Sequence, residues 1–229
     1  MKYYAFIENG KINGCGQCKI LNDDILNIEV NEEIYNNIEK YIYQDGEIVL
    51  NPNYEEELEQ KERERIAKLY LTGADVERGI YQAKGMDFDD IVALVTQLQP
   101  QGLDIKALKI ELKANNFYRG NPYVSAIGQL LGFSEEQLDK FFEFNDHFYL
   151  MKFDLEVKTT PENAIVKING VETKTASLPF DSEYVCEIYC EGYITQILNG
   201  KIQNDEYIEV VLESNTPTEE LNIENLEEV

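Results

Sequence analysis

The stretch from Thr159 to Gln196 constrains the fold more than any other part of the sequence. Apolar residues alternate with polar ones at Ala164, Val166 and Ile168, a period of two that is typical of a half-buried β-strand. Similar short runs follow, and the residues that mark them are Val185 with Glu187 and then Ile208, Val210 and Leu212. This part of the chain therefore predicts the strands of a small β-sandwich or barrel.

Turn residues punctuate these runs. Asn169 and Gly170 form a two-residue hairpin signal, because both tolerate the positive φ of a type I′ turn. Pro161 presets φ at the first corner, and Asn163 tolerates the left-handed region. We expect four residues to determine the turns, namely Pro161, Asn169, Gly170 and Gly192.

Several short motifs in this stretch occur together. They are P-E-N-A from Pro161, V-x-I-N-G at Val166 to Gly170, the pair Leu178 and Pro179, and E-G-Y at Glu191 to Tyr193. Taken together, they resemble a PEGA domain, in which a glycine stands at the position of Asn163. The resemblance covers roughly Phe153 to Glu213 and implies an accessory, Ig-like β-sandwich of cell-surface and multidomain proteins, without a catalytic centre.

The charge of the chain excludes several classes of partner. Lysine and arginine number 20 against 44 acidic residues, which gives a net charge of -24. That charge repels phosphate backbones and anionic headgroups, so nucleic acid and membrane surfaces are poor partners. Residues 1–10 have no long apolar region, and no apolar run approaches the roughly 20 residues that span a bilayer. We expect a protein of the cytoplasm of the producing bacterium.

The four cysteines form two local pairs. Cys15 and Cys18 have the C-x-x-C spacing of zinc knuckles and dithiol sites, but a second pair of metal ligands is missing. Cys186 and Cys190 lie on an extended strand, about 13 Å apart from the rise per residue, so they cannot bond to each other. We expect free thiols, and a functional C-x-x-C remains an alternative.

The punctuation of the chain predicts an α+β multidomain protein. Its expected parts are a small N-terminal α+β hairpin module at 1–53, a charged connecting helix at 54–71, a central short-helix bundle at 72–150, a C-terminal all-β PEGA/Ig-like sandwich at 151–213, and an acidic disordered tail at 214–229. The apolar positions of 54–71 do not sustain a heptad, so a coiled-coil stem is the less favoured alternative.

Capping residues set the expected helix boundaries. In the first module, Asn31 caps a helix whose apolar face is expected at Ile34, Tyr35, Ile38 and Tyr41. In the bundle, the first helix is expected to start at Thr72 or Gly73. Later helices are expected to be capped by Asp87, Asp104 and Ser134 or to start at Pro122. The last of them should point Leu138, Phe141 and Phe142 inward.

Signals of catalysis and of metal binding are weak. Asp87, Asp89 and Asp90 suit a helix N-terminus better than a cation site, because the loop lacks a fuller ligand series. His147 is the only histidine and has no serine elbow or phosphate loop beside it. Paired carboxylates for glycoside hydrolysis are not distinguished among so many acids. We expect a protein that is not an enzyme and needs no cofactor.

Residues 126–142 have the outline of a helix-turn-helix, with Gly132 at the turn. The second helix presents Glu135, Glu136 and Asp139 where DNA contacts need basic or amide side chains. An ordinary helical hairpin is the better interpretation.

Tyrosines are the candidate binding residues of the β-module. Tyr184, Tyr189, Tyr193 and Tyr207 suit a ligand face, because tyrosine combines apolar area with a polar tip. The alternative, which we favour, is that tyrosine is simply a common strand residue.

The front two thirds of the chain resemble small proteins encoded near tail-fibre and baseplate proteins in phages and prophages of low-GC bacteria. The phrases that carry this resemblance are Y-Q-D-G-E-I-V-L-N-P-N-Y-E-E-E from Tyr43 and L-T-G-A-D-V from Leu71. It implies a noncatalytic tail or baseplate component that is incorporated into the phage particle and whose partners are other tail proteins. Alternatives are a cell-surface or adsorption protein that binds host glycan or peptidoglycan, and an acidic antagonist of a basic partner.

Overall fold

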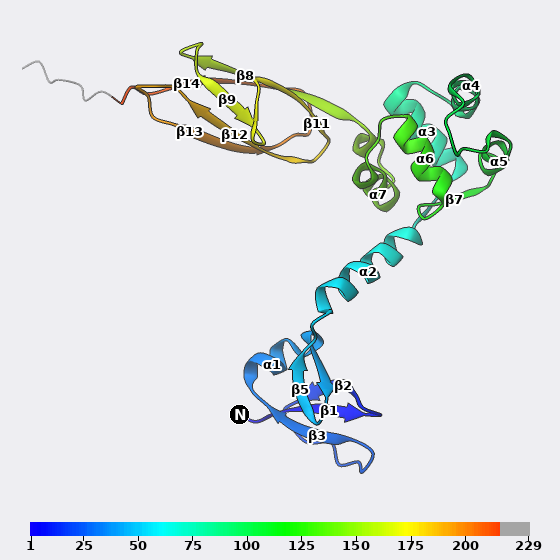
Figure 1. The fold of residues 1–229 in the computed structure, drawn as a ribbon, viewed down its shortest axis with the longest axis vertical. Helices are drawn as coiled ribbons and strands as arrows, with labels where there is room; N and C mark the ends of the chain where they lie inside the picture. Colours follow the sequence, from blue (N-terminus) through cyan, green and yellow to red (C-terminus); the bar gives the residue numbers. More distant parts are fainter. Residues whose placement is uncertain (216–229) are drawn as a thin grey trace, which may run out of the picture. The chain divides into compact units, whose positions relative to one another are not determined.

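A computed structural model describes residues 1–215 of the chain (Figure 1). The chain divides into two compact units, Met1–Arg65 and the part that begins at Ile66. The chain contains both helices and strands, which confirms the expected α+β class. Most of the predicted acidic tail lies outside the described residues. Its first two residues are described, and they are attached to the sandwich. Ser214 forms a β-bridge with Tyr193, and the Asn215 amide donates to Gly192 O at 2.8 Å.

The first unit contains two small antiparallel sheets. One has the order β2-β1-β3, and the other is the hairpin β4-β5. Their bounds are β1 Tyr3–Glu8, β2 Lys11–Gly16, β3 Leu26–Val30, β4 Tyr41–Gln44 and β5 Glu47–Leu50. Asn9 and Gly10 turn the first hairpin with positive φ, and Asp45 and Gly46 turn the second.

The helix after Asn31 is shorter than the sequence predicts. Asn31 does cap α1 (Glu32–Asn36), but a 3-10 helix, η1 (Ile38–Lys40), follows, and Tyr41 already belongs to β4. The backbone of Asn37 is no longer helical, since its φ is -132. Its side-chain amide donates a hydrogen bond to Glu33 O at 3.0 Å. That hydrogen bond competes with continuation of the helix. The expected helical face through Tyr41 was therefore wrong.

A charged helix, α2 (Tyr54–Ala67), follows the first unit's hairpins, and none of its residues is buried. The prediction that this helix reaches residue 71 was wrong. Tyr70–Thr72 is instead strand β6, which pairs with β7 (Asn116–Tyr118) and places Leu71 opposite Phe117. Both of these side chains are buried, so tertiary packing overrides the helical pattern at this point.

Five short helices surround one apolar core in the next part of the chain. They are α3 (Gly73–Lys84), α4 (Phe88–Leu98), α5 (Ile105–Glu111), α6 (Pro122–Leu130) and α7 (Glu135–Phe144), followed by the 3-10 helix η2 (His147–Leu150). The predicted caps Asp87, Asp104 and Ser134 are confirmed, since each side chain accepts a hydrogen bond from the first turn. Of the two expected starts of the first helix, Gly73 is the correct one, and Thr72 caps it. Leu138, Phe141 and Phe142 are buried as expected. No helix within residues 1–215 is both long and apolar enough to cross a bilayer.

The last part is a β-sandwich of a four-stranded sheet, β10-β9-β12-β13, and a three-stranded sheet, β11-β8-β14 (Figure 1). In the three-stranded sheet, β8 is central and pairs antiparallel with β11 but parallel with β14. The strands are β8 (Lys152–Thr160), β9 (Ile165–Ile168), β10 (Val171–Glu172), β11 (Thr175–Pro179), β12 (Glu183–Tyr189), β13 (Gln196–Lys201) and β14 (Glu206–Val211).

The inward face of β12 differs from the one that the sequence predicts. Val185 is 40% exposed, whereas Tyr184, Cys186 and Ile188 are buried in the core between the two sheets. The register explains this, because Cys186 lies opposite Ile168 and Ile188 lies opposite Val166, both inward-facing. Tyr184 and Cys186 therefore occupy two of the three buried positions of this strand.

Candidate functional site

The four candidate tyrosines do not form one face. Tyr184 is buried and its hydroxyl donates to Glu206 Oε2 at 2.7 Å. Tyr193 is half-buried and packs against the sandwich core. Tyr189 and Tyr207 are exposed, but Tyr189 lies on β12 of the four-stranded sheet and Tyr207 lies on β14 of the three-stranded sheet. The ligand face that the sequence suggested is therefore not assembled.

Tyr184 is a core residue with a perturbed hydroxyl. Burial, and then the hydrogen bond to Glu206, raise the pKa of Tyr184 from 10.0 to about 12. Its ring passes close to the backbone of the neighbouring strand, where Gly200 leaves room: a Cβ at Gly200 would lie 2.3 Å from the ring. Tyr184 thus supports the sandwich and is not available to a ligand.

The expected turn residues lie at the corners of the sandwich. Asn169 and Gly170 take φ 50 and 80 between β9 and β10, the signs that a type I′ turn needs. The Asn169 side chain also accepts a hydrogen bond from the Val185 amide at 2.8 Å, which attaches the turn to β12. Pro161 follows a cis bond after Thr160, and Gly192 has φ 82.

The outer face of the three-stranded sheet carries a hollow of about 330 Å³ between β8 and β11, which we call the β8–β11 hollow. Its lining residues are Asp154, Leu155, Glu156, Thr175, Ala176 and Ser177. The register places Thr175 opposite Glu156 and Ser177 opposite Asp154, and all four of these residues are exposed. Two carboxylates and two hydroxyls therefore form a square on one face of the sheet.

Tyr207 lies in the same cross-strand row as this square. In the parallel pairing of β14 with β8, Tyr207 is the partner of Glu156, so the row reads Thr175, Glu156, Tyr207 across the three strands. Tyr207 is 55% exposed, and its hydroxyl donates to Glu209 Oε1 at 3.1 Å. Sequence alone named Tyr207 but not its neighbours, because the parallel pairing of β8 with β14 leaves no local signal in the sequence.

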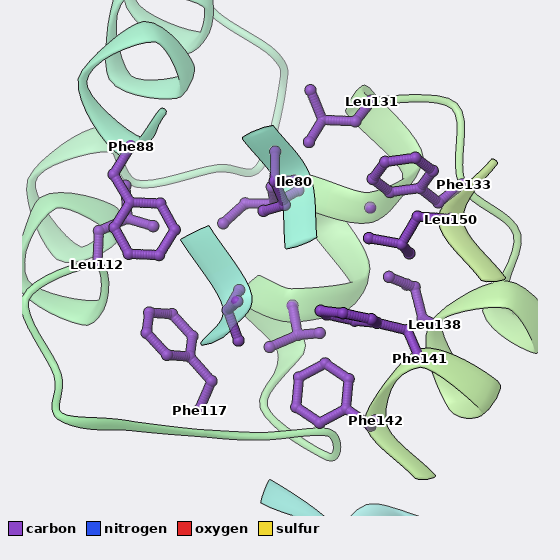
Figure 2. Close-up of a pocket in the computed structure, with 14 residues that line it drawn as sticks. Ile80, Phe88, Leu112, Phe117, Leu131, Phe133, Leu138, Phe141, Phe142 and Leu150 are labelled. Atoms are coloured by element: carbon purple, nitrogen blue, oxygen red, sulfur yellow. The ribbon is translucent and has the colours of Figure 1, made fainter. Parts of the chain in front are cut away.

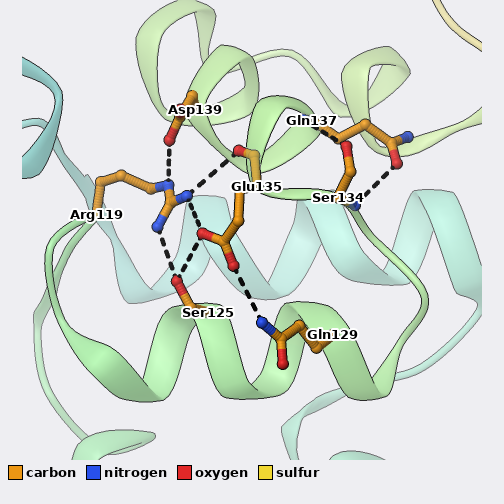
Figure 3. A network of polar contacts seen from close by, with 7 residues as sticks. All are labelled: Arg119, Ser125, Gln129, Ser134, Glu135, Gln137 and Asp139. Carbon is orange, nitrogen blue, oxygen red and sulfur yellow. Dashed lines mark hydrogen bonds and ion pairs between the residues drawn. The ribbon is translucent and has the colours of Figure 1, made fainter. Parts of the chain in front are cut away.

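A second polar group, inside the helical bundle, is built around Arg119 (Figure 3). Arg119 follows β7 and its side chain is 8% exposed. The guanidinium donates to Ser125 Oγ at 3.0 Å and to Glu135, and its Nε lies 2.7 Å from Asp139 Oδ1. Burial tends to raise the pKa of Glu135, but the hydrogen bonds from Arg119 and Ser125 outweigh it and lower that pKa. Burial raises the pKa of Asp139 despite the nearby guanidinium.

The Arg119 network ties β7, α6 and α7 together and leaves little of the guanidinium open to a ligand (Figure 3). Of the three acids that argued against a DNA-reading helix, Glu135 and Asp139 thus pair with Arg119, whereas Glu136 pairs with Lys140 at the surface of α7. Residues 126–142 form α6, a turn at Gly132 with φ 78, and α7, as expected for a helical hairpin.

The interior of the bundle contains a small apolar cavity of about 30 Å³ (Figure 2). Its walls include Ile80, Phe88, Phe117, Phe133 and Phe141, which point toward a common centre. A water molecule needs two or more polar partners, and this lining offers apolar side chains. The cavity is therefore a packing void of the core and is too small for an organic ligand.

The cysteines do not show the features of an activated site. Cys15 is half-buried and its thiol donates to Tyr35 O at 3.6 Å, while Cys18 is exposed. Burial raises the pKa of the Cys15 thiol, and the charge of Glu39 adds to this effect. A nucleophilic or redox thiol needs the opposite shift. Cys186 and Cys190 are buried free thiols of the sandwich.

The remaining candidates have structural partners. The Asp87 side chain caps α4 and forms a capping box with Asp90. His147 stacks on Phe148 with ring centroids 4.4 Å apart. Within residues 1–215, no group of three or more His, Cys, Asp and Glu side chains is placed to hold a metal ion. Comparison of the chain with known protein families and with curated proteins finds no match in either case.

Proposed function

We propose that this chain is a noncatalytic structural or assembly protein of a phage tail or baseplate, which displays a PEGA-like sandwich. The observation that carries the proposal is the way the chain is divided: the boundary between two compact units, after Arg65, falls within α2, a helix with no buried residue. A polar connecting helix of this kind suits a protein that bridges partners rather than one that encloses a substrate.

The attachment of the sandwich to the bundle also supports this role. Phe180, in the turn before β12, lies 5.4 Å from Phe148 and 5.2 Å from Tyr149 between ring centroids. The Phe180 amide donates to Met151 O at 3.2 Å, and Gln137 Nε2 of α7 donates to the same oxygen at 3.3 Å. Aromatic packing and hydrogen bonds therefore hold the sandwich against the bundle, as a display module needs.

Mass spectrometry of gradient-purified tail particles, induced from the source bacterium, tests the proposal. We expect this chain in the particle fraction at a stoichiometry comparable to known tail proteins. A parallel preparation from a strain with the gene deleted controls for carry-over, and electron microscopy of its particles shows whether assembly depends on the chain. Recovery of the chain from the soluble lysate alone would overturn the assignment to a particle.

A further inference from the structure

We propose that the β8–β11 hollow, together with Tyr207, binds a neutral glycan. This inference rests on the outer face of the three-stranded sheet and does not depend on the assembly role. The four polar side chains of the hollow, Asp154, Glu156, Thr175 and Ser177, are exposed. None of them makes a side-chain hydrogen bond or an ion pair with the rest of residues 1–215.

The polar groups of the hollow match a ligand that is rich in hydroxyl groups. Ionised Asp154 and Glu156 accept hydrogen bonds, whereas the hydroxyls of Thr175 and Ser177 both donate and accept. A sugar hydroxyl can likewise donate to a carboxylate and accept from a serine or threonine. Because acceptors face donors directly across the two strands, adjacent hydroxyl groups of a sugar can bind both types at once.

Tyr207 supplies the apolar part of the site. It lies one strand beyond Glu156, a separation of about 4.8 Å, which is close to the width of a sugar ring. Its hydroxyl is tethered to Glu209, and Glu209 lies 3.8 Å from Lys158 Nζ. The tether restricts the ring while leaving it 55% exposed, and the C–H face of a sugar ring packs well on such an aromatic surface.

The charge of this face selects among ligands. Asp154, Glu156 and Glu209 outnumber Lys152 and Lys158 on this face, and the charge of Lys158 is already opposed by Glu209, so phosphorylated or carboxylated polymers are repelled. A single metal ion fits poorly, because Asp154 and Glu156 are two residues apart on one strand, about 6.6 Å, and no third ligand is placed with them within residues 1–215. A neutral polyhydroxyl ligand meets neither obstacle.

Binding of the full-length protein to two kinds of probe tests the proposal. The first probe is a printed array of neutral glycans, and the second is a matched array of carboxylated and phosphorylated glycans. Tyr207→Ala and Glu156→Gln are the test variants. Tyr189→Ala is the matched control, since Tyr189 is 52% exposed on the opposite sheet. Thermal melting of each variant confirms that the sandwich is intact.

We expect the wild-type protein to bind neutral glycans on the first array and to bind the carboxylated and phosphorylated glycans of the second array more weakly. Tyr207→Ala should weaken binding by about tenfold, and Tyr189→Ala should leave it unchanged. Failure to bind any neutral glycan, or stronger binding to the anionic glycans, overturns the proposal. The proposal is also overturned if Tyr207→Ala and Tyr189→Ala lose glycan binding equally, or if Tyr207→Ala binds glycan as strongly as the wild-type protein does. Binding that needs a divalent cation, or that salt abolishes, points to an ion or a basic partner instead and refutes the neutral ligand.

Discussion

Arg119 is a buried cation of the bundle, and its partners lie on the helices α6 and α7 (Figure 3). A buried ion pair adds little stability compared with apolar packing. Removal of one partner, however, leaves the charges of the remaining partners buried without a counter-charge. The two carboxylates are partly exposed, so water can solvate them in part once the guanidinium is gone. The cost of losing Arg119 should therefore lie below that of a fully buried pair.

Replacement of Arg119 with alanine should destabilise the second unit by about 2 kcal/mol, because Glu135 and Asp139 lose their counter-charge. Urea unfolding, followed by the circular dichroism of the helices, measures this effect. Arg78→Ala is the control, since the Arg78 to Asp75 pair lies on the surface of α3, and it should leave the midpoint unchanged. Equal midpoints for both variants would show that the Arg119 network does not stabilise the bundle.

Tyr184 makes the sandwich sensitive to alkaline pH. Its folded pKa, about 12, lies above the ordinary value of 10.0, so the folded state holds this proton more tightly than the unfolded state does. The stability that this provides is complete below pH 10 and is lost as the pH rises toward 12, by about 2 kcal/mol. In Tyr184→Phe, which has no such proton, stability should fall less steeply over this range. Parallel slopes for parent and variant would exclude this linkage.

Gly170 is the turn residue whose conformation is hardest to replace. With φ at 80 it occupies a region that β-branched residues avoid. Gly170→Val should lower the stability of the sandwich by about 1 to 2 kcal/mol, whereas Asn169→Gly should change it less, losing chiefly the hydrogen bond to the Val185 amide. Thermal melts of the two variants test this, and an unchanged midpoint for Gly170→Val would show that the turn can relax.

At the scale of elements, close helix contacts depend on small residues. Gly79 lies in the middle of α3, where a Cβ would come within 2.5 Å of the buried Phe141 ring of α7. Alanine normally stabilises a helix interior by about 1 kcal/mol relative to glycine. The packing of α7 on α3 therefore opposes the intrinsic preference of the helix.

A double-mutant cycle separates these two effects. Gly79→Ala alone should destabilise the bundle, because the gain in helix propensity is smaller than the cost of displacing Phe141. In a Phe141→Leu background the same change should be neutral or stabilising, since the ring that it meets is gone. Urea midpoints of the four proteins measure the coupling, and additive effects would mean that the two helices adjust freely.

How far the sequence predicts an element depends on whether its signal is local. Caps such as Asp87 and Ser134 lie next to the helices that they begin, so they could be recognised directly. Strand β6 could not be recognised in this way, because its three residues directly follow a helix. They form a strand only by pairing with β7, more than forty residues later. The same reason hid the β8–β11 hollow and the row that leads to Tyr207.

At the scale of the whole molecule, α2 contains the boundary between the two compact units, after Arg65. It contains Lys61, Arg63 and Arg65, and none of its residues is buried. Brief digestion with trypsin should therefore cut in α2 first and leave two resistant fragments, because local opening of an exposed helix costs little. Mass spectrometry of the fragments identifies the site. Initial cuts inside the bundle or the sandwich would contradict the division of the chain.

The parallel pairing of β8 with β14 also has a consequence for synthesis. The central strand of the three-stranded sheet is made first, and one of its two edges has no partner until Glu206 to Val211 has left the ribosome. At about 5–20 residues per second, the nascent chain exposes that edge for several seconds. The sandwich is thus completed only after translation has passed its last strand, and until then a chaperone or another nascent chain can compete for the open edge of β8.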